Sequence, residues 1–195
     1  MQLRIRRLKF YLKEMGYRNI GGKSVFYLFM VTNLVYGIML LVTIPKVMSY
    51  SGGMKIFDMM PLGYSSQYAN SLLGKLGIEG RNAYLFTQLP VDFIYPFLFG
   101  ITYTLLLAYF LRRLGSLKDV YFYLCLLPII AGVFDYSENF GIISMLISYP
   151  HSSEIVIQLT SCFTVLKSLI TTLYFVVLIF VLMFFIVREL YHKVL

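Results

Sequence analysis

Four long apolar stretches constrain the fold of this chain more than any other feature of its sequence. They cover residues 24–44, 91–111, 120–148 and 155–187. Each is long enough for the roughly 20 residues that a helix needs to cross the hydrocarbon core of a bilayer. A segment in lipid must satisfy its own backbone hydrogen bonds, and a helix does so. The sequence therefore predicts an all-α, polytopic membrane protein with a bundle of four transmembrane helices.

Composition supports the same fold class. Hydrophobic residues make up 59% of the 195 residues and charged residues 13%, which leaves too little polar surface to cover a soluble domain. The net charge of +8 would suggest nucleic acid as the partner of a soluble protein. Here the basic residues gather at the ends of the apolar stretches, where membrane topology explains them. We expect the lipid bilayer as a partner and no nucleic acid, and the oligomeric state is not indicated.

The basic residues also predict an orientation. Most of them lie before the first stretch, between the second and the third, or after the fourth, whereas the long connection 45–90 holds few. Loops rich in Lys and Arg stay on the cytoplasmic side. We therefore expect cytoplasmic N- and C-termini and one transmembrane domain over residues 24–190. Residues 1–23 are expected to form a basic amphipathic segment, with a disordered basic tail as the alternative.

The connection 45–90 has helical signals of its own. Ser65 or Ser66 fits the N-cap position of a helix that runs through Leu76. Gly77 would break this helix before a second one starts. Loops of this length without structure or function are uncommon in compact domains. The connection is therefore expected to form a helical lid over the outer ends of the spans.

Ionised residues occur in three of the four stretches at one common depth. Asp92, Glu138 and Lys167 each lie about 20 residues from the nearest basic residue at the cytoplasmic end of their helix, and Asp135 lies slightly closer. At about 1.5 Å per residue, this places them about 25 to 32 Å from the cytoplasmic side. That depth is the outer edge of a hydrocarbon layer roughly 30 Å thick. The arithmetic predicts a polar cluster beneath the lid.

These polar residues also share helix faces. Asp135, Glu138 and Asn139 follow i, i+3, i+4 spacing, so they lie on one face of the third helix. Asp92 and Tyr95 do the same on the second helix. Polar side chains in lipid turn toward the bundle interior, so the stripes should face one another around a pocket. The candidate ligand-binding residues are Asp92, Tyr95, Asp135, Glu138, Asn139 and Lys167, with Arg81 above them in the lid.

The charges of this cluster do not balance. Three acids face Lys167, and Arg81 is the one further base expected close above them. If Arg81 does not reach the cluster, at least one carboxyl group is protonated or neutralised by a cation, because desolvated carboxylates repel each other. The imbalance favours a protein that binds or transports a small hydrophobic or cationic ligand, such as a cation, an amphiphilic amine or a proton.

Two other functions are compatible with the same residues. The cluster fits a structural or assembly protein in which polar groups only hold the bundle together. It also fits an intramembrane enzyme that uses paired carboxylates, with Asp92 and Asp135 as the pair. The GxGD motif of intramembrane aspartyl proteases is absent from the sequence. Whether the protein is an enzyme stays open, and these features lean against one.

The sequence indicates no metal and no cofactor. His151 and His192 fall on opposite sides of the membrane, so a histidine-based metal centre is not expected. Cys125 and Cys162 lie at different depths and should be too far apart for a disulfide. Within the apolar stretches, Pro96 and Pro128 can kink the second and third helices, because proline removes a backbone hydrogen bond. The alternative is that they are ordinary prolines of transmembrane helices, whose freed carbonyls are satisfied by neighbouring groups.

Four short motifs resemble an uncharacterised family of small bacterial four-span integral membrane proteins with no known activity. They are GRNAY at 80–84, DFIYP at 92–96, FDYSEN at 134–139 and YP at 149–150. The resemblance extends over residues 72–167. It implies the four-span architecture, a bacterial inner membrane and the candidate positions, and it implies no function.

Overall fold

The computed structural model describes residues 21–115 and 123–194, and in these ranges the chain forms helices joined by turns and loops, without a strand. The first helix is continuous from Gly22 to Tyr50 and consists of α2 (Gly22–Ile38), a π-helical turn (Met39–Thr43) and α3 (Ile44–Tyr50). The others are α4 (Ser66–Ala83), which continues through a π-helical turn (Tyr84–Gln88) into α5 (Leu89–Arg113), then α7 (Leu127–Ser148) and α8 (Glu154–Val194).

Three of these helices are long and apolar enough to cross a membrane. They are Gly22–Tyr50, Ser66–Arg113 and Glu154–Tyr191. The helix α7 is not among them, and it carries Asp135, Glu138 and Asn139 near its middle. The chain is therefore a helical protein with the features of a membrane protein.

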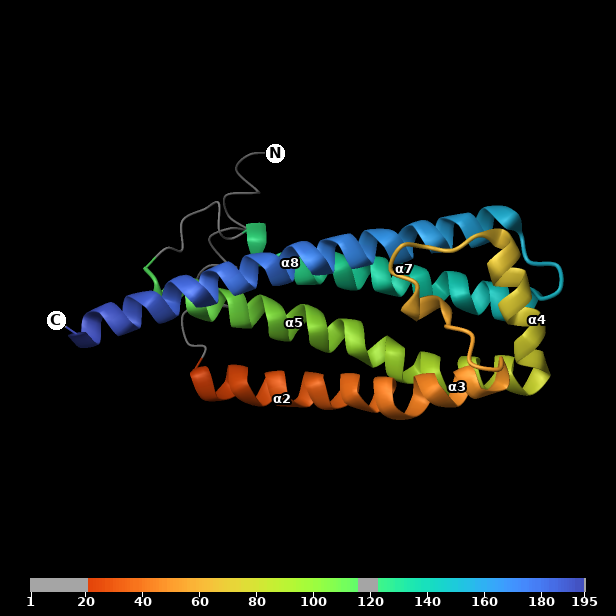
Figure 1. Ribbon diagram of the computed structural model, residues 1–195, viewed down its shortest axis with the longest axis horizontal. Coiled ribbons are helices and arrows are strands. Elements are labelled where there is room, and N and C mark those ends of the chain that lie inside the picture. The colour runs from red at the N-terminus through yellow and green to blue at the C-terminus, as the bar shows by residue number, and fades with distance from the viewer. Residues whose placement is uncertain (1–20, 116–122, 195) are drawn as a thin grey trace, which may run out of the picture.

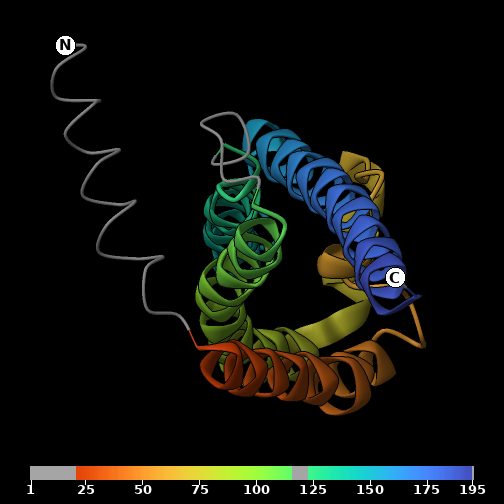
Figure 2. The same ribbon diagram turned by 90° about the vertical axis from the view of Figure 1, so that its left-hand side faces the viewer.

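The long helices run side by side along one axis (Figure 1). The helix α2 packs against α5, α5 against α7, and α7 against α8, while α5 also contacts α8. Seen along the axis, α2 and α8 are the two ends of an arc that has α5 and α7 between them (Figure 2). The start of α2, the end of α5 and the end of α8 lie at one end of the bundle (Figure 1).

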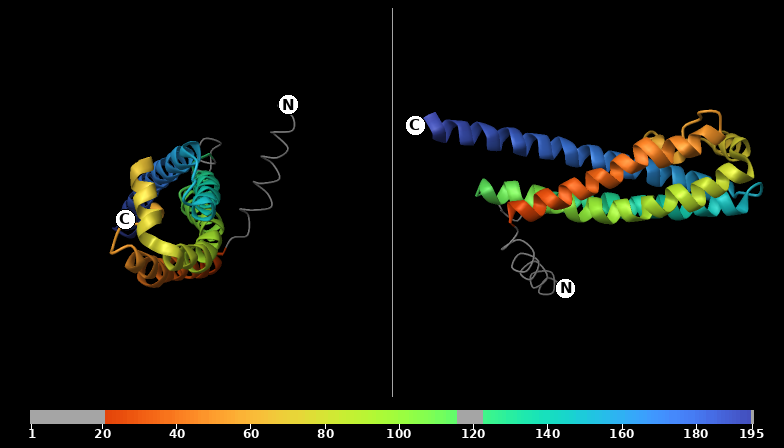
Figure 3. Two further views of the ribbon diagram at one scale, coloured as in Figure 1. Left: turned by 90° about the vertical axis from the view of Figure 1, so that its right-hand side faces the viewer. Right: turned by 90° about the horizontal axis from the view of Figure 1, so that it is seen from below.

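The helix α4 lies across the opposite end of the bundle (Figure 3). Ser65 caps it, because its hydroxyl oxygen accepts a hydrogen bond from the Tyr68 backbone N–H at 3.2 Å. Gly77 interrupts it with a positive φ of 62°, a conformation that glycine adopts without strain. The sequence-based predictions of a cap at Ser65 and of a break at Gly77 are confirmed.

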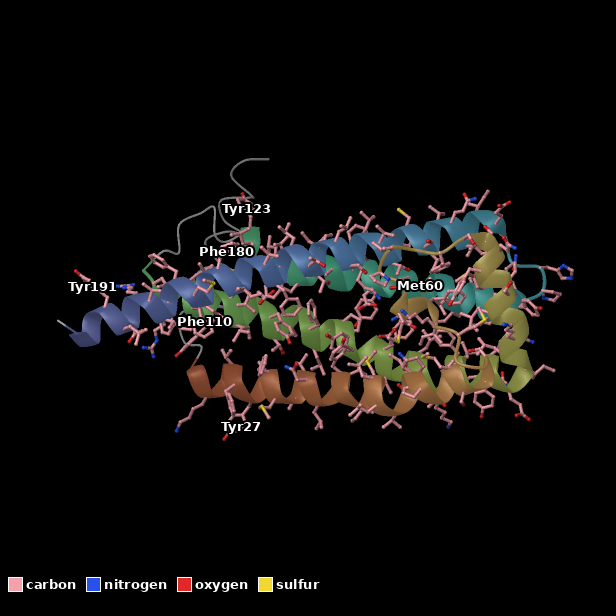
Figure 4. The ribbon with its side chains drawn as sticks, in the orientation of Figure 1. Tyr27, Met60, Phe110, Tyr123, Phe180 and Tyr191 are labelled. Atoms are coloured by element: carbon pink, nitrogen blue, oxygen red, sulfur yellow. The ribbon has the colours of Figure 1, made fainter. Side chains whose placement is uncertain are left out.

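The largest hydrophobic core lies beneath α4. Leu72 and Leu73 of α4 are fully buried, together with Ile56 and Phe57 of the preceding loop. Full burial of such a side chain contributes about 1.5 to 3 kcal/mol. By contrast, many large apolar side chains of α2 and α8 are exposed, including Tyr27, Phe180 and Tyr191 (Figure 4). The connection 45–90 is thus part of the folded core, and the outward faces of α2 and α8 are apolar.

Two boundaries differ from the sequence-based prediction. The first helix does not end at residue 44 but continues to Tyr50, and Pro45 directly follows the π-helical turn Met39–Thr43, where the regular hydrogen-bond ladder is already interrupted. The prediction of a kink at Pro128 is wrong, because α7 begins at Leu127 and Pro128 lies in its first turn, where its missing N–H costs no intrahelical hydrogen bond. Pro96 does lie inside α5. The predicted N-terminal amphipathic segment, up to residue 20, and the predicted start of the third stretch at 120 lie outside the described residues.

Candidate functional site

Three of the predicted site residues form a paired ionic cluster between α7 and α8. The Lys167 ammonium on α8 lies 3.1 Å from Asp135 Oδ1 and forms a second ion pair with Glu138 Oε2. The other Glu138 oxygen accepts a hydrogen bond from the Thr164 hydroxyl at 2.7 Å. Glu138 is fully buried, and the Lys167 side chain is 16% exposed. The sequence-based expectation that these residues converge is met, and each of them has a charged partner.

Small residues allow the helices to approach at this level. A Cβ atom on Gly141 of α7 would lie 2.8 Å from Cγ2 of Thr160 on α8. A Cβ atom on Gly132 would lie 3.1 Å from the Pro96 carbonyl oxygen of α5. Close approach of helix backbones at small residues is a general way of packing helices in membranes. The paired cluster therefore lies in a tightly packed interface.

A second acidic group lies between α5 and the loop before α4. Asp92 is on α5, and Asp58 is in a short 3-10 helix, Phe57–Met59. Their carboxyl groups are within hydrogen-bonding reach of each other. The Tyr84 hydroxyl donates to Asp58 Oδ2. In the described ranges, the remaining buried oxygens Asp58 Oδ1 and Asp92 Oδ2 have no hydrogen-bond donor. We refer to Asp58 and Asp92 as the acid pair.

The other predicted residues have different surroundings. Asn139 donates from Nδ2 to the Asp92 backbone carbonyl at 3.2 Å, and its buried Oδ1 lacks a donor among the residues described. Tyr95 stacks on Tyr36 of α2, with ring centroids 5.2 Å apart. These two contacts tie α7 and α2 to α5 on either side of the acid pair.

Arg81 does not join the acidic residues. Its Nη1 donates to the Leu73 backbone carbonyl at 2.9 Å, and its guanidinium lies 4.5 Å from the centre of the Tyr149 ring. Arg81 therefore lies at the α4 end of α7, away from Asp92. The condition that it would balance the acids is not met.

A cavity of about 490 Å³ lies beside the acid pair. It is enclosed by the π-helical turn after α2, the loop 55–61, and parts of α5, α7 and α8. Its volume is in the range of small-molecule sites. Asp92, Tyr95, Asp135 and Lys167 line this cavity, whereas Glu138, Asn139 and Arg81 do not.

The acidic groups that line the cavity are only partly matched by basic groups. Asp135 faces Lys167, but the acid pair has no basic partner in the described structure. Lys55 lines the cavity with its side chain at the exposed surface. Nearby, burial raises the pKa of Tyr64, and the negative charge of Glu138 raises it further, so that this hydroxyl stays neutral. The site can accommodate a proton or a cation between Asp58 and Asp92.

Asp58 is the functional candidate that the sequence analysis missed. The connection 45–90 was expected to cover the pocket, and Asp58 follows Ile56 and Phe57, which are fully buried. A carboxyl group directly after buried apolar residues in a covering loop indicates a side chain directed inward. That signal was present in the sequence as IFD at 56–58.

Nothing in the described part of the chain fits a metal site. No group of three or more His, Cys, Asp or Glu side chains could hold an ion there. Both cysteines are free, Cys125 in the interior and Cys162 at the surface, as their spacing predicts.

Comparison of the chain with protein-family models, curated proteins and solved structures finds no match. The resemblance noted from short motifs stays a prediction. Function is therefore argued from the site, which is in any case where function resides.

Proposed function

We propose that the protein is a four-span membrane protein of a bacterial inner membrane, with both termini cytoplasmic and the connection 45–90 as an outer lid. The span that needs explanation is α7, whose middle is polar. It packs against α5 on one side and α8 on the other, and its Asp135 and Glu138 are paired with Lys167. Charged residues in spanning helices face such interiors, which supports α7 as the fourth span.

Within this bundle, we propose that the cavity binds a small cationic amphiphile. The acid pair carries this proposal, because the buried Asp92 and the partly buried Asp58 face each other beside the cavity. Their oxygens Asp58 Oδ1 and Asp92 Oδ2 have no hydrogen-bond donor among the described residues. Two such groups cannot both stay ionised unless a cation or a proton lies between them. A ligand ammonium group would satisfy both carboxylates at once.

The remaining lining suits the apolar part of such a ligand. Met39 and Leu40 line the cavity from the α2 side and Phe99 from α5. The rings of Tyr36 and Tyr95 also line it and provide faces that attract a cation. The cavity thus combines an anionic end with apolar and aromatic walls.

The route into the cavity is lateral. Leu40 of the first helix and Thr172 of α8 line the cavity and are also exposed on the outer surface of the bundle. The helices α2 and α8 are at the two ends of the arc of helices, with α5 and α7 between them (Figure 2). An amphiphile would therefore enter from the lipid between α2 and α8, and release on the other side of the membrane would make the same site a transport site.

One observation favours an enzyme as the second candidate. Two carboxyl groups that share one proton at an accessible cavity can serve as general acid and general base, and Asp58 with Asp92 has this arrangement. One carboxyl group would hold the proton and act as the acid, and the other would act as the base. The third candidate, a purely structural cluster, fits Lys167 with its partners and does not account for the acid pair.

The test uses protein in neutral phosphatidylcholine nanodiscs. Thermal unfolding is measured with dodecylamine, dodecyltrimethylammonium and uncharged dodecanol, and with metal ions and sterols. A ligand raises the unfolding temperature through its preference for the folded state. We expect both cationic probes to raise it in the wild type and in the exposed-acid control Glu79→Gln, and not in Asp92→Asn.

Equal effects of dodecanol and the amines would refute the cation proposal. Conversion of a lipid, sterol or peptide by the wild type and not by Asp58→Asn, measured by mass spectrometry, would select the enzyme instead. If the wild type responds to no probe and Asp92→Asn only unfolds at a lower temperature, the cluster has a structural role.

A further inference from the structure

A second cavity, of about 260 Å³, lies at the α4 end of the bundle. One wall comes from α4 and the π-helical turn after it, with Ile78, Arg81 and Leu85. The other wall is the end of α7, with Ile147 and Tyr149. None of these residues lines the cavity beside the acid pair, so the two sites are separate.

Arg81 is held in a fixed position in this second cavity. Its guanidinium stacks 4.5 Å from the centre of the Tyr149 ring, and Nη1 donates to the Leu73 carbonyl at 2.9 Å. A guanidinium group carries five N–H donors in a planar fork. Within residues 21–115 and 123–194, no carboxylate pairs with Arg81 and no other acceptor reaches it. The remaining donors are available to a ligand, and the order imposed by stacking lowers the entropic cost of binding one.

The rim of this cavity is apolar and exposed. Ile78 is 72% exposed and Ile147 is 68% exposed. Val133, Phe140 and Ile147 are all exposed and are spaced seven residues apart along α7. Residues at this spacing share one helix face, and the stripe spans about 21 Å at the helical rise. An apolar stripe of that length starting beside a fixed guanidinium matches an acyl chain attached to an anionic headgroup.

We infer that this cavity binds the phosphate headgroup of an anionic glycerophospholipid, with an acyl chain along the Val133, Phe140 and Ile147 stripe. Arg81 donates to the phosphate oxygens, for which the guanidinium fork has the right geometry. A phosphatidylcholine headgroup brings its own cation toward Arg81 and binds less well. The inference requires the bundle to be membrane-embedded and does not depend on the cation-binding function of the other cavity.

Native mass spectrometry of the full chain in detergent tests this. The probes are phosphatidylglycerol and phosphatidylcholine with identical acyl chains, and glycerol phosphate without a chain. We expect phosphatidylglycerol to bind at least tenfold more tightly than phosphatidylcholine to the wild type and to the control Lys75→Gln. Arg81→Gln should abolish this preference, and Arg81→Lys should keep part of it, since the charge is retained and the fork is lost.

Arg81→Gln also removes a stacking contact, so a second variant is needed. Ile147→Glu keeps the Arg81 side chain and places a negative charge at the rim of the same cavity, on a residue that is already exposed. It too should abolish the preference for phosphatidylglycerol. Equal binding of the two lipids by the wild type, or a preference that survives in both Arg81→Gln and Ile147→Glu, would overturn the inference. Binding of glycerol phosphate as tight as that of the lipid would overturn the role of the acyl stripe.

Discussion

Two acidic groups in the same bundle differ in what they are paired with. Asp135 and Glu138 on α7 share the ammonium of Lys167, and Glu138 also accepts from Thr164. Asp58 and Asp92 face each other, and apart from the Tyr84 hydroxyl they have no donor among the described side chains. The difference separates a cluster that holds helices together from one that needs a proton or a cation. From residue type and predicted depth alone, the two acidic groups would be expected to behave alike.

The paired cluster should be the more sensitive to a single change. Replacing Lys167 with Met leaves two carboxyl groups facing each other in the interior, and breaking a buried ion pair in this way costs about 3 to 5 kcal/mol. We expect the free energy of unfolding, measured by titration with sodium dodecyl sulfate, to fall by that amount. Adding Glu138→Gln to Lys167→Met should recover part of the loss. The matched control is Lys55→Met, which changes an exposed lysine and should shift stability by less than about 0.5 kcal/mol.

Equal losses in Lys167→Met and Lys55→Met would contradict the comparison. They would mean that the carboxyl groups of α7 do not depend on Lys167 and that the bundle tolerates both groups in the same way.

The interface around the paired cluster gives the second largest effect. Gly141→Ala places a methyl group against the Thr160 side chain of α8, and its Cβ would lie 2.9 Å from the Thr160 Cβ. Overpacking of this kind costs about 1 to 3 kcal/mol. Gly37→Ala in α2 is the control, because its Cβ would meet nothing within 4 Å, and alanine favours a helix by roughly 0.5 to 1 kcal/mol over glycine. Stability of both is measured in the same titration, and a neutral Gly141→Ala would mean that α7 and α8 are not tightly packed here.

The sequence predicted one of these two acidic groups and not the other. Asp135, Glu138 and Lys167 could be predicted to meet, because helical spacing fixes the face of each and the distance from basic anchors fixes the depth. Asp92 was placed in the same cluster, but its nearest acidic partner comes from a loop. That loop turns through Gly52 and Gly53 at positive φ, and no periodic pattern predicts the path of such a segment.

The same distinction applies to the connection 45–90. Its capped helix followed from Ser65 and Gly77, which act locally. The direction of the Arg81 side chain depends on its contact with Tyr149, which is far away in the sequence. The residues next to Arg81 therefore could not show whether it would approach the acidic residues. The helices could thus be predicted from local sequence signals, whereas tertiary contacts determine which charged side chains come together.

The acid pair should respond in binding and not in stability. Asp92→Asn removes one charge from the pair and supplies an amide that donates to Asp58, so the folded state loses no favourable contact. We expect the affinity for dodecylamine to fall at least tenfold, equivalent to about 1.4 kcal/mol, while the free energy of unfolding without ligand changes by less than about 1 kcal/mol. Binding is measured by isothermal titration calorimetry in nanodiscs, with Glu79→Gln as the exposed-acid control. A variant that binds normally but unfolds easily would show that Asp92, like Glu138, is structural.

The smallest effect should come from a hydroxyl group in the paired cluster. The single O–H donor of Thr164 has two acceptors in reach, Glu138 Oε1 at 2.7 Å and the Thr160 carbonyl at 3.1 Å. Thr164→Val keeps the shape while removing this donor. Interhelical hydrogen bonds in membrane bundles contribute about 0.6 kcal/mol on average, and Glu138 keeps Lys167 as a partner. We therefore expect a loss of that size, against none in Thr172→Val, whose exposed hydroxyl bonds only within α8. A loss as large as that in Lys167→Met would mean that Glu138 depends on the hydroxyl as much as on the ammonium. The paired cluster would then be a hydrogen-bond network in which no single partner dominates.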